Sequence, residues 1–160
     1  MASIGVIADT HDAIVPWDPV GEKVAELFAG VDLIVHCGDL TTPAVLDQLA
    51  AVAPVVAVRG VDDPPPEPPR LTESPRVIDH GGHAVGIVVA LADDGPPVAQ
   101  LFDRPVSIVL HGGTHAASVE ERDGVLLVNP GSPTLADRTT VAVVDLDGAA
   151  PSVRILDVEA

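Results

Sequence analysis

The sequence predicts an α/β fold in which two packed mixed β-sheets are flanked by helices. The first 60 residues alternate short apolar runs with helical segments, which is the pattern of a parallel sheet with helical crossovers. The rest of the chain consists mainly of short β-branched runs separated by glycine-containing turns, which is typical of hairpins. With 160 residues, the chain is expected to form a single domain over residues 1–160.

The N-terminal half is expected to contain buried strands and two helices. The strands are runs of aliphatic and β-branched residues, whereas the helices carry apolar residues three or four positions apart. Thr42 and Pro43 predict a helix start, because a hydroxyl side chain caps the first turn and proline fits its first position. The expected strands cover residues 3–7, 33–35 and 55–58, the helices residues 22–28 and 42–51, and a proline-rich loop residues 62–75.

The C-terminal half is expected to consist mainly of strands. Turns at Gly81-Gly82, Asp123-Gly124 and Asp147-Gly148 separate several of them. The expected strands cover residues 76–79, 84–89, 106–110, 118–122, 125–128, 140–145 and 152–156, and a short helix is expected at residues 98–102.

Composition excludes several classes of protein. The formal charge of −16, with Lys23 as the only lysine, opposes binding to nucleic acid. No apolar run reaches the ~18 residues of a membrane span, and the N-terminus lacks the features of a signal peptide, so a cytoplasmic location is expected. Cys37 is the only cysteine, which excludes an internal disulfide and a cysteine-based zinc cage. A role with phosphate would therefore require a local cation, such as a metal ion.

Polar residues follow the buried strands at the edge where ligands bind in open α/β sheets. Asp9 and His11 follow the first strand, Asp39 follows the second, and His115 follows a later one. Carboxylate and imidazole groups converging at one edge suit Mn, Fe or Zn, and the oxygen ligands favour the harder ions. His36, which ends the second strand, is expected to be a supporting or core histidine rather than a metal ligand.

Four short motifs occur in an order and spacing that resemble the calcineurin-like metallophosphoesterases, most closely the small YfcE-like phosphodiesterases. Each motif alone is weak, but four in register form a specific signal that covers nearly the whole chain. The motifs are Ile7-Ala8-Asp9-Thr10-His11, His36-Cys37-Gly38-Asp39, Gly112-Gly113-Thr114-His115 and Asn129-Pro130-Gly131-Ser132.

The resemblance implies a four-layer αββα sandwich with a metal centre at the strand ends. It assigns the first metal to Asp9, His11, Asp39 and His115, with Asp39 and His115 also acting in catalysis. The expected ion is Mn, with Zn or Fe as alternatives.

The same resemblance makes a second metal ion doubtful. Its usual ligands are an Asn where this chain has Val61, a His where it has Gly113, and a further His in a stretch without histidine between residues 83 and 111. Substitute ligands could come from Asp62, Asp63 or His111, which are close in sequence to the lost positions.

Two classes of function follow from this pattern. The first is a metal-dependent phosphoric ester hydrolase that uses metal-activated water on a small phosphorylated substrate. The alternative is a catalytically inactive protein of the same fold that acts as a binding or scaffold subunit, as in the retromer coat. The missing second-site ligands favour the alternative, whereas the complete first set favours the enzyme. The sequence leaves open whether a partner is a second copy of the chain or another protein.

The acidity has two readings: it serves solubility, or it reflects adaptation to high salt, since salt screens the mutual repulsion of surface carboxylates. We expect the melting temperature to rise between low salt and molar KCl, as measured by thermal unfolding. A melting temperature that stays constant or falls over this range would contradict the hypothesis.

Overall fold

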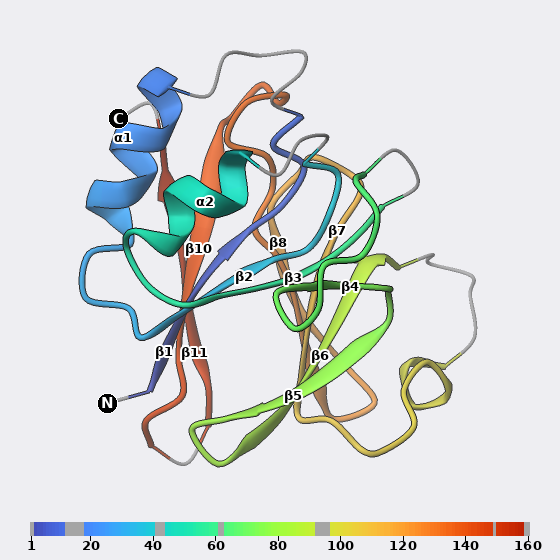
Figure 1. The fold of residues 1–160 in the computed structure, drawn as a ribbon. Helices are drawn as coiled ribbons and strands as arrows, with labels where there is room; N and C mark the ends of the chain where they lie inside the picture. The colour runs from blue at the N-terminus through green and yellow to red at the C-terminus, as the bar shows by residue number, and fades with distance from the viewer. Residues whose placement is uncertain are drawn as a thin grey trace.

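Two mixed β-sheets pack face to face, and helices cover the outer face of one of them (Figure 1). The computed structural model describes residues 2–11, 18–40, 44–60, 63–91, 97–148 and 150–158. The predicted helix start at residues 42–43 and the residues Val61 and Asp62 lie outside the described residues.

The first sheet contains six strands in the order β11-β10-β1-β2-β3-β4. Strands β1, β2, β3 and β4 run parallel, and β10 pairs with β1 in the antiparallel sense. Their C-terminal ends therefore meet at one edge, where the candidate site lies. In sheet order, the strands span Ser152–Asp157, Thr140–Asp145, Ser3–Ile7, Leu33–His36, Val55–Val58 and Leu71–Thr72.

The second sheet contains five strands in the order β5-β6-β7-β9-β8. Strands β6, β7 and β9 run parallel, while β5 and β8 form antiparallel hairpins at the two sides. In sheet order, the strands span Arg76–His80, His83–Ala90, Ile108–Gly112, Val125–Asn129 and Ser118–Arg122.

Apolar side chains fill three layers around the sheets. Ile4 and Val6 of β1 face the second sheet, where Ile108 and Leu110 meet them. Helices α1 (Asp18–Leu27) and α2 (Ala44–Ala50) pack on the other face of the first sheet (Figure 1). The short 3₁₀ helix η1 (Val98–Gln100) and Phe102 cover part of the outer face of the second sheet. No helix in the described part of the chain is long and apolar enough to cross a membrane.

The predicted arrangement of two packed mixed sheets with flanking helices is confirmed, and four details differ. Helix α1 begins before the expected residue 22, and β7 is shifted towards the C-terminus of the expected strand 106–110. The helix expected at residues 98–102 is the three-residue η1. The segment 62–75, expected to be a loop, contains β4, which is too short to show a periodic pattern.

Gly5 determines how closely α1 approaches the first sheet. A Cβ atom at this position would lie 2.8 Å from the ring of Phe28, which is fully buried. A close-packed ring of this size has little freedom to move aside. The glycine is therefore required by packing, although glycine is a poor strand residue.

We expect Gly5→Ala to destabilise the protein by about 1–3 kcal/mol, because the added methyl group overpacks the core. Urea unfolding would measure this change. The matched background is Phe28→Leu, which removes the ring and should reduce the cost of Gly5→Ala. An equal cost in both backgrounds would show that the ring contact is not the cause.

Candidate metal centre

The loops after β1 and β7 bring three of the predicted metal-binding side chains together. Asp9 and His11 follow β1, and His115 follows β7 in the second sheet. One potential ligand atom from each residue lies within 4.8 Å of the others, and the two imidazole centroids are 5.3 Å apart. The cluster therefore spans the junction between the two sheets and forms only when they pack.

The predicted metal-binding residues share an unusual backbone conformation. Asp9, His11, Asp39 and His115 have φ angles of +54°, +43°, +59° and +64°. The only other non-glycine residue with positive φ in the described part of the chain is Asp123, which lies in a hairpin turn. Left-handed backbone is costly for residues with a Cβ atom and is concentrated at functional sites, where the surrounding structure enforces it. The conformation therefore indicates that the loops fix the directions of these four side chains.

Backbone hydrogen bonds join the loop after β1 to the loop after β2. The Asp9 N–H donates to the Gly38 carbonyl at 3.0 Å, and the His11 N–H donates to the Asp39 carbonyl at 3.0 Å. These bonds continue the pairing of the parallel strands beyond their ends. Three of the four predicted ligands are consequently fixed relative to one another by main-chain contacts.

Side chains of the motif Asn129-Pro130-Gly131-Ser132 form hydrogen bonds that support two loops of the site. The Ser132 hydroxyl donates to the Asp9 carbonyl at 2.8 Å, and the Asn129 amide donates to the Thr114 hydroxyl at 2.9 Å. The first bond supports the loop after β1, and the second supports the loop that carries His115. The motif was predicted only as part of a resemblance, because side-chain bonds across 123 and 15 residues leave no local signal in the sequence.

Asp63 holds the Asp39 loop rather than offering a ligand. Its carboxylate accepts hydrogen bonds from the N–H groups of Asp39, Leu40 and Gly60 at 2.8, 2.9 and 2.6 Å. The guanidinium of Arg59 in turn donates to the Asp63 carbonyl at 2.9 Å. Both carboxylate oxygens are thus engaged with main chain. The suggestion that Asp63 substitutes for a lost metal ligand is therefore not supported by the structure.

His36 supports the same loops from within the core. It is fully buried, its Nδ1 accepts from the Gly38 N–H at 3.0 Å, and its Nε2 lies 3.0 Å from the Thr10 hydroxyl. Since Nδ1 acts as an acceptor, Nε2 carries the proton and donates to Thr10. The structure thus places His36 in the supporting role that the sequence analysis expected.

Burial and a neighbouring carboxylate make Asp9 difficult to ionise. Burial, with a further contribution from the adjacent Asp39 carboxylate, raises the pKa of Asp9 to about 7. Asp9 Oδ2 accepts a hydrogen bond from the Gly113 N–H at 2.9 Å. The other oxygen, Oδ1, and His11 Nε2 are buried without any hydrogen-bond partner. Buried polar atoms are normally paired, so these two atoms and His115 fit the donor set of a divalent cation.

Asp39 borders this cluster without belonging to the three-residue group. Its carboxylate lies against Gly60, where a Cβ atom would collide with it. It is also close enough to Asp9 to raise the pKa of that residue. The side chain therefore stands where a cation held by Asp9 would reduce the repulsion between the two carboxylates.

The structure also bears on Gly113, the position at which the resemblance expects a histidine of a second metal site. Gly113 has a φ of +98°, and a Cβ atom there would lie 2.7 Å from the Cβ of Ala90. A histidine at this position would require Ala90 to move. His111 lies on β7, where it is buried with neither ring nitrogen hydrogen-bonded, and burial lowers its pKa. It is not part of the three-residue cluster formed by the described residues.

We expect Asp63→Asn to destabilise the protein by about 1–3 kcal/mol and to weaken metal binding, because an amide nitrogen cannot accept the N–H bonds of the Asp39 loop. Urea unfolding and a metal titration would measure the two effects. Asp103→Asn, at an exposed position, is the matched control. Unchanged unfolding of Asp63→Asn would contradict the assigned role.

Comparisons with known proteins agree with the fold. Residues 2–149 match the model of the calcineurin-like phosphoesterase superfamily domain. A probable metallophosphoesterase of Methanothermobacter thermautotrophicus is 34% identical over 155 residues, which cover 91% of this chain and 86% of the relative. A solved archaeal phosphodiesterase superposes with a TM-score of 0.73 at 22% identity, covering 96% of this chain and 99% of that chain. Vps29 of Chaetomium thermophilum superposes with a TM-score of 0.72 at 23% identity, covering 98% and 97%. The chain therefore belongs to the calcineurin-like metallophosphoesterase family.

Proposed function

We propose that this protein hydrolyses phosphoric diesters with a single divalent metal ion held by Asp9, His11, Asp39 and His115. The observation that carries the proposal is the pair of buried, unpartnered atoms, Asp9 Oδ1 and His11 Nε2, next to the His115 imidazole. Leaving such atoms unpaired costs free energy unless a cation satisfies them. Family membership supports the same reading, since the family depends on divalent metals.

A divalent cation bound there would polarise a phosphoryl oxygen and lower the pKa of a water molecule. The chain's own residues supply the geometry. The loop bonds hold Asp9 and Asp39 side by side, which provides negative charge for the cation. His115 stands at the outer side of the cluster and borders the neighbouring cavity. We therefore assign Asp39 and His115 to contacts with the ester and with the attacking water.

The proposed ion is Mn²⁺. Carboxylate ligands favour hard ions, and two of the four proposed ligands are carboxylates. Zn²⁺ should compete, because affinity at mixed nitrogen and oxygen sites rises along the divalent series. Since the chain carries a formal charge of −16, the cation would also reduce repulsion between the protein and an anionic ester.

The alternative is a binding or scaffold protein without catalytic activity. The backbone at Gly113, which resists a histidine, favours this alternative because a second cation would lack a ligand there. Two ions normally hold the attacking and leaving oxygens together, so a single ion gives less stabilisation of the transition state. Similarity to Vps29 gives the alternative a structural precedent.

The decisive experiment compares Asp9→Asn with the wild-type protein. We expect the wild type to bind about one Mn²⁺ and to hydrolyse bis(p-nitrophenyl) phosphate. Removing the charge of a direct ligand should weaken metal binding by at least about tenfold, as changes even in supporting residues do. Metal analysis by mass spectrometry and a nitrophenolate assay would provide the two measurements.

Asp123→Asn is the matched control, because Asp123 has the same left-handed backbone but is exposed in a turn. Unchanged metal content in Asp9→Asn would overturn the metal assignment. Metal binding at this site without hydrolysis of the diester would favour the scaffold function.

A further inference from the structure

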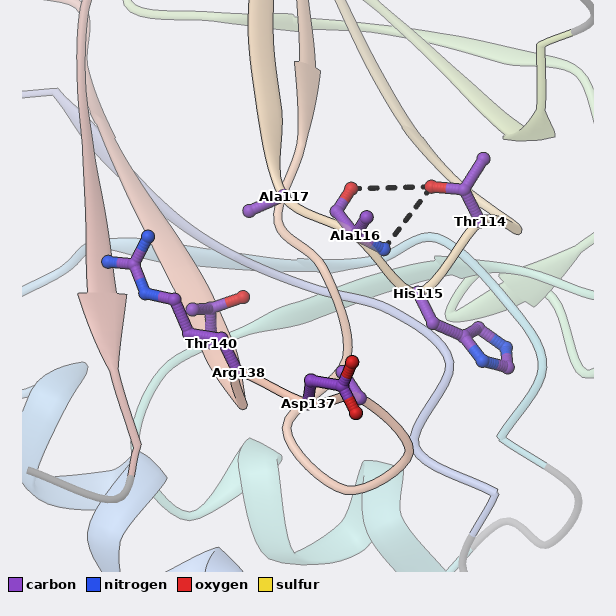
Figure 2. A pocket seen from close by; sticks show the side chains of 8 residues that line it. Thr114, His115, Ala116, Ala117, Asp137, Arg138 and Thr140 are labelled. Carbon is purple, nitrogen blue, oxygen red and sulfur yellow. Dashed lines mark hydrogen bonds between the residues drawn. The ribbon is translucent and has the colours of Figure 1, made fainter.

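A cavity of about 530 Å³ lies directly beside His115. Residues 114–117 form one side, and Asp137, Arg138 and Thr140 form the other (Figure 2). Ala136 also lines the cavity. Its volume falls within the roughly 300–1,000 Å³ of small-molecule sites. Because His115 belongs to both the cavity and the metal cluster, a ligand in the cavity would adjoin the proposed reaction centre.

The walls of the cavity are small and offer few free hydrogen-bonding groups. Ala116, Ala117 and Ala136 present no polar side-chain group to it. The Thr114 hydroxyl accepts from the Asn129 amide and lies 3.3 Å from both the N–H and the carbonyl of Ala116, as drawn in Figure 2. Its hydrogen-bonding capacity is thus used within the protein. The cavity therefore suits a group that gains from apolar contact rather than from many specific hydrogen bonds.

The hydroxyl of Thr140, on the opposite side of the cavity, also forms its hydrogen bond within the protein. Its hydroxyl donates to the Pro130 carbonyl at 2.7 Å and is buried. The Thr140 side chain therefore shapes the cavity without presenting a free donor to it.

Charges at the rim disfavour a second anionic group. The guanidinium of Arg138 donates to both carboxylate oxygens of Asp157, at 2.6 and 3.3 Å, so its charge is already balanced. Asp137 adds an exposed carboxylate to the same rim. Of the residues that line the cavity, Asp137 thus keeps an unbalanced negative charge, whereas the charge of Arg138 is paired with Asp157 outside the lining. A substituent that carried a further phosphate or carboxylate would be repelled.

We propose that this cavity binds an uncharged organic substituent of the phosphoric ester, and that Ala117 and Ala136 set the permitted size. The inference rests on the proposed function, because it places the phosphorus at the metal centre beside His115. The substrate class is then a phosphodiester with a substituent of aryl or nucleoside size and without additional negative charge. Esters with only small alkyl groups would leave the cavity unfilled.

Binding of phosphonates tests the cavity independently of turnover. We expect the Mn²⁺-supplemented protein to bind phenylphosphonate about tenfold more tightly than methylphosphonate in isothermal titration calorimetry, because the ring buries more apolar surface. It should also bind 4-carboxyphenylphosphonate more weakly than phenylphosphonate. Ala136→Leu should reduce the preference for phenyl over methyl to about one, and Ala117→Leu provides a second variant should the first fail to fold.

Ala50→Leu is the matched control, since Ala50 is exposed on α2 and distant in the chain from both cavity walls. It should keep the tenfold preference. Equal binding of phenyl- and methylphosphonate by the wild type would overturn the cavity assignment, as would a preference unchanged by filling the cavity.

Kinetics with two nitrophenyl diesters separate this inference from the proposed function. Hydrolysis of both methyl p-nitrophenyl phosphate and bis(p-nitrophenyl) phosphate at equal kcat/KM, with equal phosphonate binding, would overturn the cavity assignment and leave the hydrolase standing. A tenfold phosphonate preference without any hydrolysis would overturn the hydrolase and support the cavity. Failure to bind either phosphonate, together with no hydrolysis of either diester, would overturn both.

Discussion

The burial of the Asp9 carboxylate next to Asp39 is the constraint on which the rest of this site depends. Burial and the neighbouring charge raise the pKa of Asp9 to about 7, and one of its oxygens has no hydrogen-bond partner. Such an arrangement costs free energy in the absence of a cation. The fold nevertheless enforces it through main-chain bonds from the neighbouring loop and through Ser132. Metal binding would therefore offset the free-energy cost of burying this carboxylate, and should stabilise the native state.

Both sheets contribute to the centre, which explains why so many of its supports are distant in sequence. Asp9 belongs to the first sheet, and its carboxylate is contacted by the N–H of Gly113 from the second. A Cβ atom at Gly112 would lie 2.8 Å from the Cβ of Ala8, so the two strand ends can meet only because this residue is glycine. Packing between the sheets and assembly of the site are thus one event, and core changes near Ala8 would alter the position of Asp9.

Much of the fold could be predicted from sequence, because each buried strand is a local run of β-branched residues and most turns carry glycine. Strand β4 was not predicted, because two residues cannot show periodicity. The convergence of Asp9, His11 and His115 was also expected from their places after strands. What could not be predicted was the means of convergence: left-handed backbone at each residue, and the engagement of Asp63 with three main-chain N–H groups. The bonds from Asp63 to Asp39 and Leu40 join segments 24 and 23 residues apart, which leave no local pattern.

The asymmetry of the centre gives its two sides different roles. On the side of Gly113, the left-handed backbone and the nearby Ala90 Cβ disfavour a histidine. On the side of His115, alanine residues leave open space. A site that gains less from a second cation can compensate by binding more of the substrate, since contacts remote from the reacting atoms help to position it. In the single-ion hydrolase proposed above, binding of the organic substituent in the cavity would supply positioning that a second ion could otherwise give.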